Sequence, residues 1–400
     1  MSGKFESIEE FYDQPFFSLN KFTFRMSGWW PFQETKKRQM IWSFVWFCIV
    51  TVVVPEVIYL IQIIKDLTKV IECFMALTIT YAAFTMAFNA WHNNDSVKKI
   101  LEHIHANWED LRDEQELRIF SERAAVSRLL NVFYAAMVFY NIVIHTVSPL
   151  IPPAVDWFVS GNWSRPEKNL LEVEYLVLDP DEYYTLIYVH GAQAGFLVVF
   201  VIITCDTFFM TITQHSCGMF MLLGYRIRKM DEDIFEKRCS SSYATRRVQE
   251  IVFYHRDCLR FTQLLEATMS VMFLFQLFPT VIMISVVGAQ AMIRAKAIEE
   301  LIKFGFIFIS MIFRLFFICW CSQNIMDSSL AVMSYLTNTR WYEYPESTKK
   351  LFTLMFMRCA KPSYLTAGNV FTLNFVTYAG MIKTSMSYLT MILQTQESNL

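Results

Sequence analysis

Near its end the sequence reads Phe371-Thr-Leu-Asn-Phe-Val-Thr-Tyr-Ala-Gly-Met-Ile-Lys-Thr-Ser-Met-Ser-Tyr-Leu-Thr-Met-Ile-Leu-Gln394. This stretch lies within an apolar segment, Asn369 to Gln396, that holds a single charged residue, Lys383. About 20 predominantly apolar residues are enough for a helix to cross a bilayer. The segment is therefore predicted to be a membrane-spanning helix.

Six further apolar blocks precede this segment, and 54% of the 400 residues are hydrophobic, against about 45 to 50% in soluble domains. The blocks are Met40 to Ile64, Cys73 to Trp91, Leu129 to Ile151, Leu186 to Thr213, Ala267 to Met292 and Phe304 to Ile325. Together with the last segment they predict an all-α, polytopic membrane protein with seven transmembrane helices.

The basic residues are distributed unevenly between the two alternating sets of loops. The set that contains the N-terminal segment holds 26 of the 35 Lys and Arg residues. Because cytoplasmic loops retain basic residues, the N-terminus is predicted to be cytoplasmic and the C-terminus extracellular. A G-protein-coupled receptor has the opposite orientation, and neither Asp-Arg-Tyr after the third span nor Asn-Pro-x-x-Tyr occurs here.

Two Asn-x-Ser sequons fall on opposite sides of the membrane in this topology. Asn162 lies in an external loop and is expected to carry a glycan, whereas Asn94 lies inside and is expected to stay bare. Of the nine cysteines, only Cys73 lies near the outer face, so no structural disulfide is expected. The Cys319-x-Cys321 pair has no clustered His or carboxylate beside it and is interpreted as packing rather than as a metal site.

No motif in the chain indicates catalysis or a cofactor. The sequence has no Gly-rich phosphate loop, no His-Glu-x-x-His and no nucleophile elbow. We therefore expect a protein that is not an enzyme and that uses no cofactor.

The run from Trp341 to Gln394 resembles the C-terminal signature of insect odorant receptors. The matching pieces are Trp341-Tyr-Glu-Tyr-Pro345, Lys361-Pro before Thr366-Ala-Gly368, and Lys383-Thr-Ser-Met-Ser-Tyr388 followed by Gln394. A Gly-x-Trp-Pro before the first span is also typical of the family, and Gly28-Trp-Trp-Pro31 matches it. From composition alone, this element and Lys36-Lys-Arg38 are interpreted as interfacial, with the indoles at headgroup depth.

The resemblance implies a ligand-gated, non-selective cation channel of the plasma membrane, located in the dendrite of a sensory neuron. In that family the last helix lines a pore at the centre of a tetramer, and an odour-tuning subunit assembles with a shared co-receptor. The co-receptor carries a long insertion between spans four and five, and here only Gln214 to Glu266 separates them. The chain is thus expected to be a tuning subunit of a heterotetramer that binds a small volatile ligand and contacts membrane lipid.

The family organisation divides the chain into segments. Residues 1–39 form a cytoplasmic N-terminal segment, 40–325 form helices one to six with the ligand pocket in their outer half, 326–368 form a cytoplasmic anchor, 369–396 form the pore helix and 397–400 an extracellular tail.

The last span mixes hydroxyls with bulky apolar side chains on one face. Ser387, Met391 and Thr395 follow helical spacing, which suits a wettable pore with a hydrophobic constriction. The alternative is that the polar residues join helices to one another. By position in the family motif, Met391 and Thr395 match the narrowest part of the pore and Gln394 the polar residue beside it.

The resemblance also suggests a ligand pocket among the outer halves of spans two to six. The candidates are Phe74, Thr78, Tyr81, Ile142, His145, Thr146, Phe196, Val199 and Ile282. An apolar pocket with a few hydroxyl or imidazole groups suits a small volatile molecule. Each candidate can equally be a core residue, and His145 can be a buried histidine with no ligand role.

Charged residues inside spans are costly and face protein or water. Asp206 and Arg314 lie at a similar depth in spans four and six, so they either pair across helices or meet water separately. Glu56 is expected to reach the interface at the outer end of span one. Lys383 lies near the middle of its span and is expected to face water or a partner.

Two apolar stripes at helical spacing lie on the cytoplasmic side. The first is Val97, Ile100, Leu101, Ile104, Trp108 and Leu111, and the second is Val248, Ile251, Val252, His255, Leu259 and Thr262. The first stripe is expected to pack within its own subunit. The second is expected to form a subunit interface, because the family builds its anchor from this region.

Two rival functions remain open from the sequence. A gustatory receptor of the same superfamily carries Thr-Tyr, five apolar residues and Gln-Phe in its last helix, whereas this chain has Ser387-Tyr388 and Gln394-Thr395. A metabotropic receptor is opposed by the distribution of basic residues.

Overall fold

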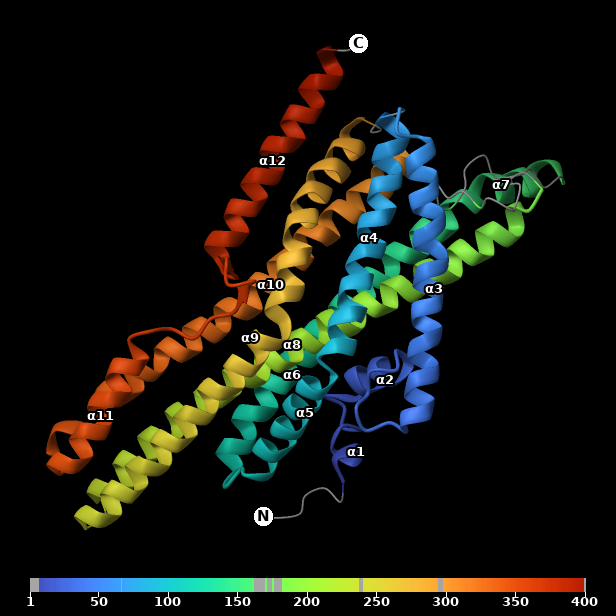
Figure 1. The fold of residues 1–400 in the computed structure, drawn as a ribbon. Coiled ribbons are helices and arrows are strands. Elements are labelled where there is room, and N and C mark those ends of the chain that lie inside the picture. Colours follow the sequence, from blue (N-terminus) through green and yellow to red (C-terminus); the bar gives the residue numbers. More distant parts are fainter. Residues whose placement is uncertain are drawn as a thin grey trace.

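The computed structural model describes residues 7–65, 67–161, 170, 175, 182–236, 240–293 and 298–398. The described chain is a bundle of long helices with one small antiparallel sheet (Figure 1). The α-helices are α1 (Ile8–Phe11), α2 (Ser18–Met26), α3 (Thr35–Gln62), α4 (Leu67–His92), α5 (Asn94–Glu109), α6 (Glu114–Val147), α7 (Ile151–Ser160), α8 (Tyr184–Glu236), α9 (Ser241–Ile293), α10 (Ile298–Thr337), α11 (Glu346–Cys359) and α12 (Phe375–Ser398). The remaining elements are the 3-10 helices η1 (Ser148–Leu150) and η2 (Trp341–Glu343) and the strands β1 (Thr366–Ala367) and β2 (Phe371–Thr372).

Six of the predicted spans correspond to helices that are long and apolar enough to cross a membrane. They are α3, α4, α6 together with α7, α8, α9 and α10. With 53 residues each, α8 and α9 are roughly 80 Å long, far more than the hydrocarbon core of about 30 Å requires. The protein is thus a multi-pass helical membrane protein whose helices continue beyond the bilayer.

The seventh predicted span differs from the structure at its start. Residues Asn369 to Asn374 are not helical, and α12 begins at Phe375. Gly368 and Asn369 both have positive φ, a conformation that helices do not use. The most apolar stretch of α12 falls short of those in the six spans named above, because α12 mixes Lys383 and several hydroxyls with its apolar residues.

The N-terminal segment packs its indoles inside the molecule. Trp29 and Trp30 are each 1% exposed, so they contact other parts of the chain and do not face lipid headgroups as the interfacial interpretation expected. Trp30 donates from Nε1 to Glu9, at 2.7 Å, and the buried Lys21 forms ion pairs with Glu9 and Asp13. Aromatic residues are found both at membrane interfaces and in protein cores, and these two tryptophans belong to the core.

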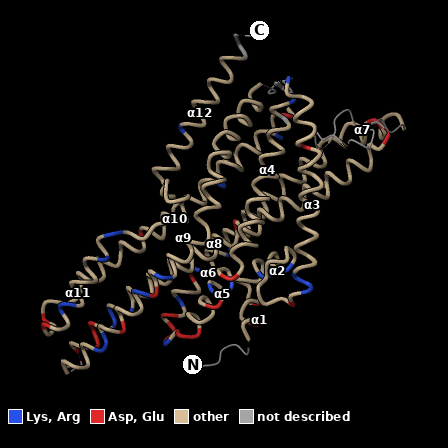
Figure 2. Tube along the Cα trace, viewed as in Figure 1, with Lys and Arg blue, Asp and Glu red and all other residues tan. Residues whose placement is uncertain are grey.

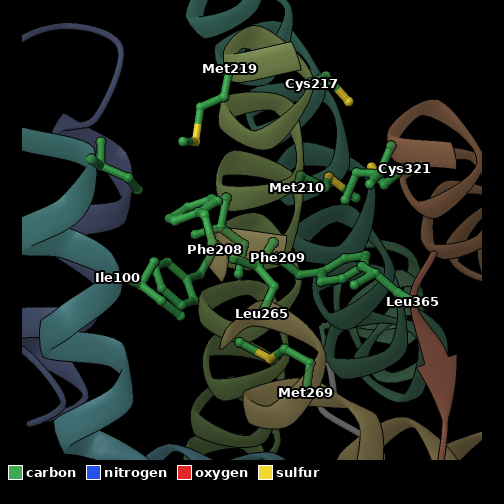
Figure 3. Packing of buried hydrophobic residues seen from close by; sticks show 14 of the residues in the cluster. Ile100, Phe208, Phe209, Met210, Cys217, Met219, Leu265, Met269, Cys321 and Leu365 are labelled. Carbon is green, nitrogen blue, oxygen red and sulfur yellow. The ribbon is translucent and has the colours of Figure 1, made fainter. Parts of the chain in front are cut away.

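The central helix of the bundle is α8. Nearly every residue from Val201 to Gly224 is buried, because α8 packs against α2, α3, α4, α6, α9 and α10. A helix that is apolar or small on all sides is expected in such a position. Figure 3 shows Phe208 and Phe209 of α8 gathered with Leu265, between Ile100 of α5 and Leu365 near β1.

Charged residues gather at the end of the molecule that contains α5, α11 and the far ends of α8 and α9 (Figure 2). The N-terminus lies towards this end and the C-terminus at the opposite end (Figure 1). At the charged end, Arg226 donates from Nε and Nη2 to Glu116, at 2.8 and 2.9 Å. Burial alone raises the pKa of the nearby Asp113, but hydrogen bonds from Lys229, the Glu116 backbone and Tyr225 hold it below its usual value.

The two cytoplasmic stripes have different outcomes. The first is buried within the chain on α5 and just beyond it, as expected. In the second, Val248, Ile251, His255 and Thr262 are also buried within the chain, where α9 packs against α5, α8, α10 and α11. The prediction that this stripe as a whole forms a subunit interface is therefore wrong, since only Val252 and Leu259 of its six residues are not fully buried.

The predicted anchor segment includes a helical extension of the sixth predicted span. Helix α10 continues without a break past residue 325 to Thr337, so the anchor segment 326–368 starts inside a helix. Within it, Tyr344 donates to Asp231 of α8, at 3.1 Å, and Arg340 pairs with the same carboxylate. Burial and the adjacent Asp231 charge raise the pKa of Tyr344 well above its usual value.

Candidate functional site

A buried polar network lies in the middle of the helix bundle. Arg314 of α10 donates from Nε to Oδ2 of Asp206 on α8, at 2.7 Å, and from Nη2 to Oδ1, at 3.3 Å. Tyr134 of α6 donates to the same carboxylate. Asp206 is 2% exposed. The pairing that the sequence left open is therefore present, and it is a two-point contact with a third donor.

The network continues through an amide to two more helices. Arg314 also donates to Oε1 of Gln276 on α9, at 2.6 Å, and Gln276 donates to Thr85 on α4, at 3.3 Å. Tyr134, Gln276 and Thr85 were not singled out from the sequence, although each is a polar residue inside an apolar span. Five helices thus meet at one set of polar contacts, which fixes their positions relative to each other.

One group of ligand candidates lies where α6 meets α8. Ile142 is 9% exposed, and its side chain lies 3.1 Å from the Cβ position that Gly195 of α8 leaves empty. Phe196 packs near Phe139, with ring centroids 6.0 Å apart. Tyr188 of α8 donates to the backbone carbonyl of Thr146. These contacts bring Ile142, Thr146 and Phe196 into one region.

A second group lies between α4, α9 and α10. Phe74 packs against an apolar cluster formed by Met283, Val287, Ala291 and Phe304. Thr78 is 9% exposed and bonds to the carbonyl of Phe74, at 2.7 Å. Val199 and Ile282 are partly buried, but Tyr81 is 38% exposed. These contacts therefore place Ile142, Thr146 and Phe196 in one group and Phe74 and Thr78 in another.

The expectation that Glu56 reaches the interface is wrong. Glu56 is 1% exposed, and Thr80 of α4 donates to its Oε1, at 3.4 Å. A carboxyl group at the outer end of a span can turn inwards when a neighbouring helix supplies a hydroxyl, because a hydrogen bond reduces the cost of burial.

The last helix has one face fixed to α9 and the other exposed. Ser385 donates to the carbonyl of Val281, at 3.1 Å, and accepts at its own carbonyl from Ser285, at 2.9 Å. Leu389 lies against Gly288 of α9. The opposite face, which includes the predicted pore residues, is exposed in the subunit: Lys383, Thr384, Ser387, Tyr388, Met391, Gln394 and Thr395.

A small hairpin holds the base of α12 on α9. Strand β1 pairs with β2, with Thr366 opposite Thr372. The backbone N–H of Thr366 donates to Glu266, at 2.8 Å, and that of Gly368 donates to the Ser270 hydroxyl, at 2.9 Å. Gly368 has φ +62° and lies against Leu274, so its position requires glycine. The Thr-Ala-Gly motif thus attaches the last helix to α9.

A measurable cavity lies at the charged end, away from the predicted ligand pocket. Its volume is about 470 Å³, and charged side chains of α6, α8 and α9 line it, among them Glu116, Arg226, Arg247 and Asp257. No sequence pattern predicts this cavity, because its lining comes from four separate helices and short turns.

The fold and these sites define a multi-pass helical membrane protein with a polar network at mid-depth and a last helix that is half exposed. The family described as "7tm Odorant receptor" matches residues 66–386. The chain belongs to this odorant receptor family, which confirms the resemblance to insect odorant receptors and favours it over a gustatory receptor. The family is one of receptors and not of enzymes.

Relatives and solved structures agree with this assignment. Odorant receptor 22c of Drosophila melanogaster is 22% identical over 363 residues, which are 88% of this chain and 89% of that one. Odorant receptor Or1 of Anopheles gambiae is 24% identical over 48% of this chain and 51% of its own length. The structure of the insect olfactory receptor OR5 from Machilis hrabei in complex with eugenol has a TM-score of 0.75 at 14% identity, over 94% of this chain and 97% of that one. This last similarity shows the same fold.

Proposed function

We propose that the chain is an odour-tuning subunit of a ligand-gated, non-selective cation channel. A small volatile ligand binds among the outer halves of the spans, and a pore lined by α12 opens in response. The observation that carries the proposal is the exposed face of α12, where Ser387, Met391 and Thr395 have no cover within the subunit. Equivalent faces of neighbouring subunits would enclose a polar path with one apolar ring.

The contacts of α9 supply a route from ligand to pore. Val281 and Ser285 hold Ser385 of α12 through hydrogen bonds. The pocket candidate Ile282 lies between them in sequence, and Met283 belongs to the cluster that contacts Phe74. A ligand that displaces this part of α9 therefore acts directly on the helix that carries Met391.

Membership of the family supports the assembly and location that we propose. The tuning subunit joins a co-receptor in a heterotetramer at the plasma membrane of a sensory dendrite, with its N-terminus inside and its C-terminus outside. The solved relative from Machilis hrabei carries eugenol, a small volatile molecule, which supports a ligand of that class here. The hairpin at Thr366 to Thr372 separates the cytoplasmic anchor, 326–368, from the pore helix, which we now start at Phe375.

The test is ligand-evoked current in excised inside-out patches without GTP, from cells that express the chain with an odorant co-receptor. The account predicts a cation current within milliseconds of ligand application, absent from cells that express neither subunit. A current that requires GTP would instead indicate a metabotropic receptor and would overturn the proposal.

A further inference from the structure

Three polar atoms in the outer part of α6 are buried without a hydrogen-bond partner among the described residues. They are Oδ1 of Asn141, Nδ1 of His145 and Oγ1 of Thr146. A buried polar atom without a partner is costly and uncommon in a native structure. Three such atoms within six residues, beside pocket candidates Ile142 and Phe196, indicate that something outside the chain completes their hydrogen bonds.

The orientation of the Asn141 amide is fixed by its own contacts. Its Nδ2 donates to the carbonyl of Met137, at 2.9 Å, and to the hydroxyl of Ser310 on α10, at 2.6 Å. Because a carbonyl accepts but never donates, the nitrogen must be the atom on that side. The orphaned Oδ1 is therefore an acceptor.

The tautomer of His145 follows in the same way. Its imidazole makes a hydrogen bond with the backbone of Leu170, and Nδ1 is the nitrogen without a partner. The ring therefore donates from Nε2, and in a neutral imidazole the other nitrogen carries a lone pair. Residues four apart share one face of a helix, so Asn141 and His145 present two acceptors on the face towards α10.

A positive charge on α10 further limits the chemical groups that a ligand can place beside His145. Lys303 acts electrostatically on His145, so a second positive charge is unfavourable there. Aldehydes, ketones and esters bring only acceptors and leave both atoms unpaired. An uncharged ligand with an O–H group satisfies at least one of them. Oγ1 of Thr146, which accepts or donates, lies on the adjoining face.

We infer that the outer site between α6 and α10 selects hydroxyl-bearing ligands, alcohols or phenols, through Asn141 and His145. This inference rests on the proposed function and adds the ligand class to it. A ligand hydroxyl that donates a hydrogen bond to Oδ1 of Asn141 or Nδ1 of His145 removes the penalty of an unpaired buried atom. A carbonyl at the same place cannot donate and leaves the atom unpaired.

The test compares alcohols with aldehydes of the same carbon skeleton, which differ mainly in the donor. The pairs are 1-hexanol and hexanal, 1-octanol and octanal, and 2-phenylethanol and phenylacetaldehyde, applied to cells that express the chain with a co-receptor. The alcohol is expected to reach half-maximal current at about a tenfold lower concentration, as an unpaired buried acceptor implies.

Variants assign the preference to the two side chains. Asn141→Leu with His145→Phe is expected to bring each pair within about twofold, whereas His145→Gln, which keeps an acceptor, and Tyr140→Phe, which removes a neighbouring hydroxyl, keep the preference. Surface biotinylation checks that each variant reaches the membrane, and if the double variant does not, Asn141→Leu alone is expected to reduce the preference.

Two results overturn the inference while leaving the channel proposal intact. One is equal potency of alcohol and aldehyde in the unmodified protein, as a buried water bridging the acceptors would give. The other is a preference that persists in the double variant at the cell surface. If none of the pairs evokes a current, that result contradicts both the proposed function and the inference.

Discussion

Helices α8 and α12 differ in what surrounds their polar residues: those in the middle of α8 are buried, whereas one face of α12 is exposed. In α8 the polar side chains reach other helices: Thr211 contacts Asn20 and Asn131, and Asp206 pairs with Arg314. In α12 the hydroxyls of Thr384, Ser387, Thr390 and Thr395 each donate to the backbone carbonyl four residues earlier in the same helix, at 2.9 to 3.0 Å.

The difference teaches which helix is complete within one subunit. Polar groups of α8 are used inside the chain, so they specify its fold. On α12, Ser385 is held by α9, but the hydroxyls of the opposite face bond within their own helix and leave an exposed polar face. That face is available to water or to a neighbouring subunit. Changes in α8 should therefore cost stability, and changes on the exposed face of α12 should alter conduction instead.

The largest effect is expected at the buried ion pair. Asp206→Ala or Arg314→Ala leaves one uncompensated charge and should cost about 3 to 5 kcal/mol, seen as loss of surface protein and of thermal stability after solubilisation. The exchange Asp206→Arg with Arg314→Asp should recover part of both. If the exchanged protein is no better than either single variant, the pair does not stabilise the fold in the way described.

Two glycines give a matched comparison of the helices. A Cβ at Gly224 of α8 would clash with the ring of Tyr335, whereas nothing lies within 4 Å of a Cβ at Gly380 of α12. Gly224→Ala should destabilise the solubilised protein by about 1 to 3 kcal/mol, and Gly380→Ala should stabilise it slightly, since alanine favours a helix. Equal melting temperatures for the two variants would contradict the described packing of α8.

On α12 itself, a change of polarity should act on gating with little effect on stability. Met391 is 56% exposed in the subunit, and Met391→Ser should raise ligand-independent current, because a polar ring favours the wet state. Leu389→Ser, on the face that meets Gly288 of α9, is the control and should not raise it. The readout is basal current normalised to surface protein. A larger basal current from Leu389→Ser than from Met391→Ser would show that the face carrying Leu389 lines the pore, and would contradict the prediction.

The smallest expected effect is a change in the apparent mass of the protein. It tests on which side of the membrane each of the two sequons lies. Asn162 precedes α8 and lies outside the described residues, and Asn94 begins α5. Treatment with a glycosidase should shift the unmodified protein and leave Asn162→Gln unchanged, while Asn94→Gln should behave like the unmodified protein. A glycan on Asn94 would show that the predicted orientation is reversed.

Local patterns predicted much of the fold. Hydropathy located six of the spans, because each long apolar block needs only its own residues to form a helix. The first cytoplasmic stripe was assigned correctly for the same reason. The start of α12 was missed, although Gly368-Asn369 is a turn signal, since the apolar residues around it dominated the interpretation.

What failed depended on distant partners. The burial of Trp29, of Glu56 and of the second stripe is decided by neighbours far away in the sequence, and no single-sequence pattern reports them. The Asp206 and Arg314 pair was a geometric possibility only. Their connection to Gln276 and Tyr134 needed the positions of five helices, and so did the orphaned acceptors of Asn141 and His145.

Cysteine accessibility in the open channel shows whether the exposed face of α12 lines the ion path. Met391→Cys and Leu389→Cys would each be expressed with a co-receptor and exposed to a permeant, charged thiol reagent while ligand holds the channel open. The eight described native cysteines are buried, which keeps the background low. The account predicts that the current changes irreversibly with cysteine at 391 and not with cysteine at 389. Reaction at 389 with none at 391 would contradict it.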